Sequence, residues 1–297
     1  MNILITGSSG FIGRSLIKKL RNKHDIFAID KNEATAEFIK KHFVCDLSNY
    51  SCLSRIEDPI DVVYHFGSAS SILSYKGKEA QLADLEIQQF VNIMRFSKLK
   101  NVKKFIFPST ASLYSRNSHA NDNVLNPSNI YAAVKFTEEQ IAKHFNGGIK
   151  TLGLRIFMVY GPGEESKNDR ASPISLFMQD ILKGKSPIVF GDGTQTRDPI
   201  FIDDLVEILV NILQMPNTTG VQDICTGNLI SFNDIISRIN MISSANINPT
   251  YVSRPKSYIE GVTGDPSFAR EVLNRKFTPL DEGIRSMINP LRTNCEK

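Results

Sequence analysis

The 297-residue sequence predicts an α/β fold with a doubly wound parallel sheet and a smaller C-terminal lobe. Two observations lead to this prediction. In the first half of the chain, short apolar runs alternate with segments of helical periodicity, which is typical of βαβ units. After about residue 160 the chain has fewer continuous strands and more Pro, Gly and polar residues. Because βαβ crossovers are right-handed, we expect helices on both faces of the sheet.

Each expected element rests on a local pattern. A strand is expected where a short apolar run ends at a Gly, an Asp or a polar segment, and a helix where apolar residues recur every three or four positions. The expected strands are 2–6, 26–29, 43–45, 62–66, 105–108 and 151–156, and the expected helices are 11–20, 83–99 and 129–145.

Composition and charge exclude several classes of protein. The net charge is +4, and the basic residues are scattered, so no nucleic-acid partner is expected. No apolar segment reaches 18 residues, so we expect a cytoplasmic protein that does not enter a membrane. Cys45 continues an apolar run, and none of the four cysteines lies in a CxxC or zinc-ligand spacing. We therefore expect a reduced core cysteine, a reducing compartment and no metal site.

A glycine-rich turn follows the first expected strand. Gly7, Gly10 and Gly13 lie in the segment GSSGFIG, between a strand and the start of a helix. Glycine permits a tight turn, and free N–H groups at a helix N-terminus bind a pyrophosphate. Asp30 ends the second strand, where a carboxylate accepts hydrogen bonds from a ribose 2′-hydroxyl and repels a 2′-phosphate. The pattern predicts NAD rather than NADP, although Lys31 softens that preference.

A YxxxK pair, Tyr131 and Lys135, is the candidate catalytic pair. In a helix these positions share one face, so the phenol and the ammonium act on one small volume. The ammonium stabilises phenolate, so we expect the pKa of Tyr131 to lie below its usual value of about 10. Thr110 is expected to orient a substrate hydroxyl while Tyr131 removes its proton. A Tyr that only packs and a Thr that caps a helix are the alternatives.

Further blocks of sequence occur in a specific order. Together they resemble those of the extended short-chain dehydrogenases/reductases, in the NAD-dependent nucleotide-sugar epimerase/dehydratase family. The blocks are ITGSSGFIG at the start, Cys45-Asp46-Leu47, HFGSAS at 65–70, FPSTASLYS at 107–115, YAAVK at 131–135, LRIFMVYGPG at 154–163, GDGTQTRDPIFIDD at 191–204 and DPSFAREVL at 265–273.

The resemblance implies a Rossmann-type NAD-binding domain at 1–160, with returning segments from about 191–225, and a mainly substrate-binding lobe at 161–297. It assigns Asp46 and Leu47 to the adenine, and Lys135 also to the nicotinamide ribose. The other residues that it places near the cofactor are Phe11, Ile12, Lys31, Phe66, Gly67, Ser68, Ser70, Pro108, Phe157 and Val159.

The substrate that the resemblance implies is a nucleoside-diphosphate sugar. A guanidinium suits a diphosphate because it donates two parallel hydrogen bonds, and Arg197 and Arg254 occupy the matching positions. The other implied substrate positions are Ser109, Thr110 and Met158.

The chain departs from the family pattern where the reaction is decided. Ala111 and Ser112 stand where 4,6-dehydratases carry Asp-Glu, so a 4,6-dehydratase is not expected. Met158 stands where many epimerases carry an Asn, and Glu86 stands near a usual helix Asn. These changes leave the sugar open and suggest a divergent branch, such as one that serves a surface polysaccharide.

Three functions remain. The first is an epimerase that keeps NAD bound, oxidises C4 to a ketone and returns the same hydride to the other face. The second is a nucleotide-sugar dehydrogenase or 4-keto-sugar reductase, which exchanges its cofactor in each turnover. The third is a non-catalytic NAD-binding protein. Thr110, Tyr131 and Lys135 argue against the third, and Asp30 with the missing dehydratase pair favours the epimerase.

The helices expected at 83–99 and 129–145 carry more apolar residues than one buried stripe needs. In the family that the chain resembles, this helix pair packs against its own copy. The resemblance therefore implies a homodimer with an isologous two-fold contact. The alternative is that the surplus packs only against the chain's own core.

Overall fold

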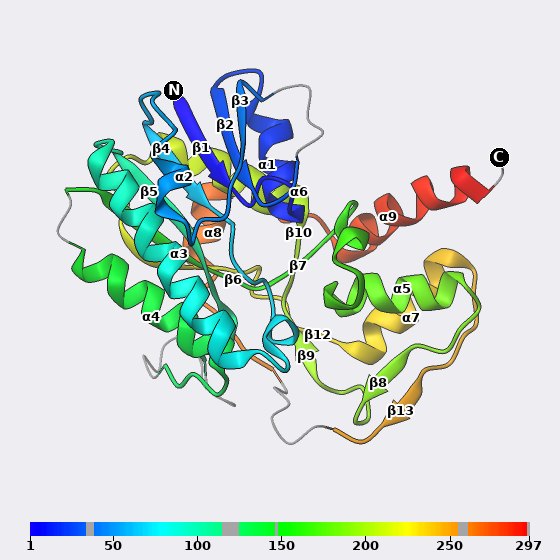
Figure 1. Cartoon of the computed structure of the whole chain (residues 1–297). Helices are drawn as coiled ribbons and strands as arrows, with labels where there is room; N and C mark the ends of the chain where they lie inside the picture. The colour runs from blue at the N-terminus through cyan, green and yellow to red at the C-terminus, as the bar shows by residue number, and fades with distance from the viewer. Residues whose placement is uncertain (34–38, 115–124, 146–147, 255–260, 296–297) are drawn as a thin grey trace. The chain divides into compact units, whose positions relative to one another are not determined.

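The computed structural model of the chain describes residues 1–33, 39–114, 125–145, 148–254 and 261–295, with the side chains of the last helix described up to Ile288 (Figure 1). The chain divides into two compact units. The first consists of Met1–Leu113, Asn126–Ile156 and Val206–Asp223, and the second of Tyr114–Leu125, Phe157–Leu205 and Ile224–Lys297. No helix among the described residues is long and apolar enough to cross a membrane.

A seven-stranded sheet forms the centre of the first unit, in the order β11-β6-β5-β4-β1-β2-β3. Its strands are β1 (Asn2–Thr6), β2 (Asp25–Asp30), β3 (Lys41–Val44), β4 (Val62–His65), β5 (Lys104–Thr110), β6 (Lys150–Ile156) and β11 (Gly220–Ile224). β1 pairs in parallel with β2 and β4, so Leu4 lies opposite Phe27 and Val63. Residues of β1 are buried on both faces, which explains their continuous apolar run. The predicted α/β fold is confirmed.

Helices cover this sheet, and two of them run side by side (Figure 1). The helices are α1 (Phe11–Leu20), α2 (Tyr50–Leu53), α3 (Glu79–Leu99), α4 (Ile130–His144) and α6 (Ile202–Asn211), and α3 lies beside α4. The ring of Phe90 on α3 meets the rings of Phe105 and Phe107 edge to face, with centroids 5.7 and 5.1 Å apart. All three rings are buried, so aromatic packing fixes α3 to β5.

β5 extends two residues beyond its expected end at Pro108. A proline lacks the N–H that a strand donates, so it is tolerated where one side of the strand is unpaired. β4 pairs with β5 only as far as Ile106, whereas β6 pairs with it up to Thr110. Pro108 therefore lies past the last residue that pairs with β4, and the strand continues to carry Thr110 to its carboxyl end.

The third stretch of the first unit returns from late in the sequence and is tied down by buried polar groups. The hydroxyl of Tyr64 donates to the carbonyl of Leu209 at 2.6 Å. The buried ammonium of Lys104 donates to the carbonyls of Ile212 at 3.3 Å and Met215 at 2.5 Å. Burial lowers the pKa of Lys104 to about 8. The returning stretch thus supplies acceptors that two central strands need.

The second unit is built from helices and short strand pairs. Its helices are α5 (Pro173–Leu182), α7 (Phe232–Ser243), α8 (Ser267–Leu273) and α9 (Leu280–Cys295). Its strand pairs are β7 (Met158–Tyr160) with β10 (Pro199–Phe201), β9 (Thr196–Arg197) with β12 (Ile230–Ser231), and β8 (Ile188–Phe190) with β13 (Thr250–Val252). α5 packs on α7 through the rings of Phe177 and Phe232, whose centroids are 5.3 Å apart. Helix packing therefore contributes more to this unit than any one sheet.

Candidate active site

The glycine turn after β1 has no room for side chains. Gly7 has a φ of +68°, and a Cβ there would lie 2.4 Å from the carbonyl oxygen of Phe66. A Cβ on Gly13 would lie 2.2 Å from the carbonyl oxygen of Gly7, and the N–H of Gly10 donates to that same oxygen at 3.0 Å. Only glycine therefore lets β1 meet the N-terminus of α1 so closely.

A dinucleotide fits this turn. The hydroxyl oxygens of Ser8 and Ser9 are buried without a hydrogen-bond partner among the described residues, as expected of groups that serve a ligand. The N-terminus of α1 adds the positive end of the helix dipole, which favours an anion. Asp30 accepts from the N–H of Ser9 at 2.9 Å and of Asn32 at 3.0 Å. One Asp30 oxygen also accepts from the side-chain amide of Asn32 at 3.5 Å, whereas the oxygen that accepts from Ser9 keeps a second lone pair with which to read a ribose.

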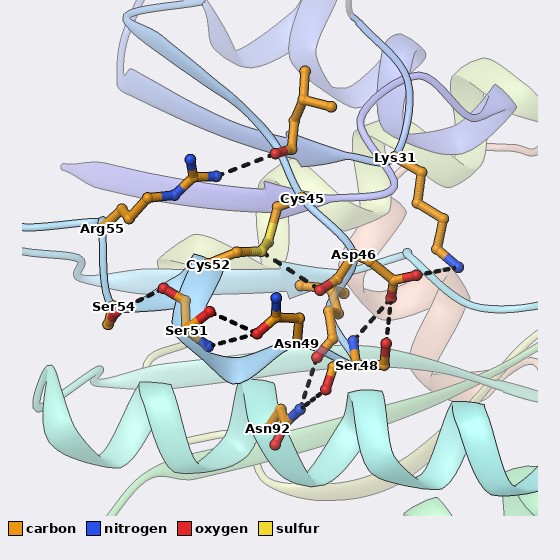
Figure 2. Close-up of a disulfide and its surroundings, with 12 residues drawn as sticks. Lys31, Cys45, Asp46, Ser48, Asn49, Ser51, Cys52, Ser54, Arg55 and Asn92 are labelled. Atoms are coloured by element: carbon orange, nitrogen blue, oxygen red, sulfur yellow. Dashed lines mark hydrogen bonds and ion pairs between the residues drawn. A yellow bond between two sulfur atoms is a disulfide. The ribbon is translucent and has the colours of Figure 1, made fainter.

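Asp46 and Leu47, which follow β3, have different surroundings. Leu47 is buried in the core, whereas Asp46 is exposed. The ammonium of Lys31 lies 3.2 Å from Asp46, and Ser48 donates to the same carboxylate (Figure 2). Burial alone would raise the pKa of Asp46, but hydrogen bonds from Ser48, Lys31 and Gln89 lower it to about 2. Asp46 is therefore ionised at neutral pH, and it pairs with Lys31, the residue that we expected to soften the preference for NAD.

The expectation of a reduced Cys45 is wrong, because Cys45 forms a disulfide with Cys52 (Figure 2). The turn between them brings their Cα atoms to 5.9 Å, a separation that a disulfide spans. In that turn the N–H of Asn49 donates to the carbonyl of Asp46 at 2.9 Å, and the N–H of Cys52 to that of Asn49 at 3.1 Å. Cys45 is buried as expected, but it no longer argues for a reducing compartment.

The segment after β4 lies beside the glycine turn. The N–H of Phe66 donates to the carbonyl of Thr6 at 3.1 Å, and the N–H of Gly67 donates to the hydroxyl of Thr6 at 3.0 Å. Ser68 is half-buried, and its hydroxyl lies 2.9 Å from the ammonium of Lys135. Ser70 is exposed. Ser68 therefore links the predicted cofactor segment to the predicted catalytic pair.

Thr110, Tyr131 and Lys135 come together within the first unit. β5 ends at Thr110, and α4 carries Tyr131 and Lys135 one turn apart. All three residues are buried, and Tyr131 shares a hydrogen bond with Thr110. The hydroxyl of Thr110 also accepts from the N–H of Ser112 at 3.1 Å. Thr110 therefore caps the following turn as well as contacting the phenol.

The expected low pKa of Tyr131 is wrong for this structure. Burial raises the pKa of Tyr131, although the Lys135 ammonium and the hydrogen bond with Thr110 act against the rise. Glu86 and Glu138 add to the rise through their negative charge. The expectation considered the ammonium alone, whereas the structure surrounds that ammonium with carboxylates.

Two buried carboxylates approach Lys135, and neither is among the predicted site residues. The oxygens of Glu138 lie 3.1 and 2.9 Å from the lysine Nζ, and an oxygen of Glu86 lies 4.0 Å from it. Glu86 also accepts from the hydroxyl of Tyr75 at 2.6 Å and from the N–H of Ala69. The sequence does hold a signal for Glu138, because it follows Lys135 by three positions and so shares its helix face.

Ser109 neighbours Thr110 on β5 but contributes to the fold. Its hydroxyl donates to Glu139 at 2.5 Å. Glu139 also accepts two hydrogen bonds from Arg155 on β6, at 2.9 and 2.8 Å. These contacts tie α4 to β5 and β6, which fixes Tyr131 relative to the strand ends. Any contact of Ser109 with a substrate must share a hydroxyl that Glu139 already binds.

The remaining predicted residues belong to the second unit. Phe157 and Val159 are buried there, and Met158 is half-buried. Arg197 lies on β9, where its guanidinium is 5.2 Å from the centre of the Phe232 ring. The guanidinium also donates to the carbonyl of the preceding residue at 2.7 Å. Arg197 therefore already has partners within the second unit.

Arg254 and Asp198 both have protein partners in the second unit. Arg254 donates to Asp192 at 2.7 Å. Asp198, next to Arg197, is buried and accepts from the N–H and hydroxyl of Thr226 at 2.9 and 2.6 Å. Asp198 therefore anchors a turn of the fold. Ser115, the last residue of the FPSTASLYS block, lies outside the described residues.

The second unit also contains a cavity that none of the predicted site residues lines. Its volume is about 540 Å³, and Arg270, Arg275 and Lys276 are in its lining. Arg270 donates to the carbonyl of Thr226 at 3.0 Å, and Arg275 lies 2.8 Å from the buried Asp204. Arg270 and Arg275 therefore stabilise the second unit through these contacts. Within the described part of the chain, no cluster of three or more His, Cys, Asp or Glu is placed to hold a metal ion.

Residues 3–225 match the sequence model of a protein family described as the "NAD dependent epimerase/dehydratase family". The chain is 26% identical, over 98% of its length, to a Methanocaldococcus jannaschii protein provisionally named UDP-glucose 4-epimerase, of which 99% is covered. It is 29% identical, over 73% of its length, to Protein CapI of Staphylococcus aureus, of which 70% is covered. The match to the family spans most of the chain, so the resemblance drawn from the sequence blocks is confirmed.

Solved structures of other proteins are similar to this chain over nearly its whole length. The UDP-glucose 4-epimerase of Thermotoga maritima, with UDP-glucose, superposes with a TM-score of 0.91 at 24% identity, covering 99% of this chain and 100% of that one. The UDP-glucuronic acid 4-epimerase of Bacillus cereus, in complex with UDP-glucuronic acid and NAD, gives 0.87 at 26% identity over the same shares. The predicted cofactor, NAD, is confirmed at the level of the family. The chain belongs to the NAD-dependent epimerase/dehydratase family.

Proposed function

We propose that the chain is an NAD-dependent epimerase that inverts C4 of a nucleoside-diphosphate sugar through a 4-keto intermediate. One observation carries the proposal. Thr110, Tyr131 and Lys135 form a single buried cluster at the carboxyl end of β5, and Ser68 connects that cluster to the segment beside the glycine turn. A proton carrier is thereby placed next to a dinucleotide-binding turn, which is the arrangement that alcohol oxidation requires.

Each residue of the cluster has a defined task. NAD, when bound, would supply the acceptor for a hydride from a sugar carbon and would return that hydride. Tyr131, as phenolate, takes the proton of the sugar hydroxyl when the hydride leaves, and it gives that proton back when the hydride returns. Thr110 holds the hydroxyl by hydrogen bonding, and Lys135 supplies positive charge next to the phenolate. Ala111 and Ser112 carry no carboxylate, so the chain lacks the acid and base with which a dehydratase removes water at this position.

The relatives support the choice of a UDP-sugar as the first substrate to test. Both solved structures described above are 4-epimerases in complex with a UDP-linked sugar. A role in making a surface polysaccharide, which the departures from the family pattern suggested, remains part of the proposal. Arg197 and Arg254 are proposed to bind the diphosphate, and the cofactor roles given above to the first unit and to Phe157 and Val159 remain part of the proposal.

We propose in addition that the chain forms a homodimer through α3 and α4. Val91 on α3 is 41% exposed, and Leu85 and Phe136 are only half-buried. Leu82 and Ile87 pack against the chain's own core around Tyr75, so they add less to an interface than their sequence suggested. Light scattering tests the dimer, and a concentration-independent mass near 33.2 kDa would exclude it.

Incubation of the purified protein with UDP-, GDP-, CDP- and dTDP-sugars tests the reaction. We expect one C4 epimer pair to interconvert without added NAD, because the hydride is returned within each turnover. Tyr131→Phe should retain its fold and lose turnover by about a hundredfold or more, the usual scale for a general acid–base group. A strict need for added cofactor in proportion to product would indicate the dehydrogenase or reductase. Wild-type turnover in Tyr131→Phe would refute the assignment.

A further inference from the structure

Glu138 has an unusual position for an ionisable side chain. It is fully buried on α4, and the ammonium of Lys135 lies 3.1 and 2.9 Å from its two oxygens. Among the described residues, Lys135 is the only hydrogen-bond donor to this carboxylate. A buried charge needs a partner to offset its lost hydration. The charge of Glu138 is therefore coupled to that of the lysine beside Tyr131.

We propose that Glu138 is a positioning residue that sets the basicity of Tyr131 through Lys135. It holds the lysine ammonium in place, and by gaining or losing a proton it changes how much of the lysine's positive charge is left to stabilise phenolate. The inference rests on the proposed function, in which Tyr131 is the proton carrier. It adds a residue that the family's YxxxK pattern does not contain.

Ionisable groups face Glu138 from three elements of the first unit. They are Lys135, Tyr131 and Glu139 on α4, Glu86 on α3, and Tyr75 at the end of η1 (Ile72–Tyr75). Lys135 is the only cation in this set. If Glu138 and Glu86 are both ionised, one ammonium faces two negative charges before Tyr131 has lost its proton. The protonation of Glu138 therefore depends on the charges around it.

The direction of the coupling follows from these charges. An ionised Glu138 neutralises Lys135 and makes phenolate less stable, whereas a protonated Glu138 leaves the ammonium to the phenolate. Burial raises the pKa of Glu138 to about 7, against the opposing effect of Lys135. Glu138 therefore changes between its protonated and its ionised form near neutral pH. Glu138 takes no proton from the sugar, because that proton goes to Tyr131 and returns from it.

The ionisation of Tyr131 can be followed without any sugar, by the ultraviolet absorbance of tyrosinate. Titration of the parent minus titration of Tyr131→Phe isolates this one residue. The same difference is then measured in a Glu138→Gln background. We expect its midpoint to fall by roughly one pH unit, the smaller end of the shifts that one nearby charge produces. The acid limb of kcat/KM should move in the same direction, with the KM for the sugar unchanged.

Two further variants make the result specific. Glu138→Asp moves the carboxylate away from Lys135, so the Tyr131 midpoint should fall by less than in Glu138→Gln. If Glu138→Gln does not fold, the shift in Glu138→Asp tests the role of Glu138. Glu164→Gln is the matched control, because Glu164 is also buried and pairs with Lys167 three positions away, but in the second unit. We expect it to leave the Tyr131 midpoint unchanged.

The possible outcomes separate this inference from the proposed function. A midpoint that stays constant or rises in Glu138→Gln, or an equal fall in Glu164→Gln, would overturn the role of Glu138. A fall specific to Glu138, in a protein that epimerises none of the sugars, would uphold that role and reject the proposed reaction. The absorbance titration does not depend on turnover, so the two failures cannot be confused.

Discussion

A buried glutamate pairs with a lysine three positions away in each unit of the molecule, and the two pairs differ in what else surrounds them. Lys135 lies 2.9 Å from Glu138, and Lys167 lies 3.0 Å from Glu164. The side chain of Lys135 is 1% exposed and that of Lys167 is 23% exposed. Distance and sequence spacing are thus nearly the same, whereas the access of water to the lysine is not.

The second difference is the number of donors. Glu164 accepts from the N–H of Ser172 at 2.9 Å, from its hydroxyl at 2.7 Å, and from the hydroxyl of Ser175. Neutral donors stabilise a carboxylate whatever the state of the lysine. Glu138 depends on Lys135 alone among the described residues. A Glu and a Lys at the same spacing, in opposite order, therefore make a structural anchor in one unit and a group that titrates near neutral pH in the other.

Replacing the lysines should separate the two pairs most strongly. Lys135→Met leaves Glu138 buried without a cation, so we expect the free energy of unfolding to fall by about 3–5 kcal/mol at mildly alkaline pH. Lys167→Met removes a partly exposed partner from a carboxylate that keeps its serine donors, so a loss of about 0–1 kcal/mol is expected. Urea unfolding of both variants measures the difference. Equal losses would remove the distinction between the pairs.

The pH dependence of stability gives the next largest effect. The pKa of Glu138 is raised from 4.5 to about 7 in the folded protein. A raised folded-state pKa means that the contribution of Glu138 is fully present below pH 4.5 and is lost as the pH rises through about 7. The loss amounts to roughly 3 kcal/mol. The stability of the parent relative to Glu138→Gln should fall over this window, as measured by urea unfolding at several pH values. A difference that is independent of pH would contradict the assignment.

The smallest expected effect comes from removing one of the serine donors to Glu164. The Ser172 hydroxyl donates to Glu164 and also accepts from the N–H of Ser175, which caps α5. Ser172→Ala should therefore cost about 1–2 kcal/mol. In that background Lys167→Met should cost more than it does in the parent, because the carboxylate then depends more on the lysine. Urea unfolding of the four proteins in this double-mutant cycle measures the coupling, and strict additivity would argue against it.

Much of the first unit could be predicted from the sequence because its signals are local. The strand at 2–6 and the helix at 11–20 coincide with β1 and α1, since a continuous apolar run and a helical stripe are both visible in one short window. The proximity of Tyr131 and Lys135 follows from helix geometry in the same way. The family was recognisable because its sequence blocks occur in order along the chain.

What escaped prediction depends on contacts between distant segments. A Glu three residues after a Lys usually marks a solvated helix face, and only the packing of α3 and α4 shows that Glu138 is buried. The predicted low pKa of Tyr131 was wrong for the same reason, because burial in the folded protein raises that pKa and the charge of Glu86, on another helix, adds to the rise. Cys45 and Cys52 match no cysteine motif, and it is the turn between them that brings their Cα atoms together.

The stretch Val206–Asp223 belongs to the first unit, and its late position in the sequence affects when that unit can fold during synthesis on the ribosome. β11, at one edge of the seven-stranded sheet, is complete only once Ile224 has been made. Until Leu209 and Ile212 have been made, the nascent first unit also lacks the carbonyls to which the buried Tyr64 and Lys104 donate. The strand β6 is made before residues 157–219, but it lacks β11 as a neighbour until those residues have also been made. The first unit therefore completes its folding only after Phe157–Leu205 of the second unit has been made.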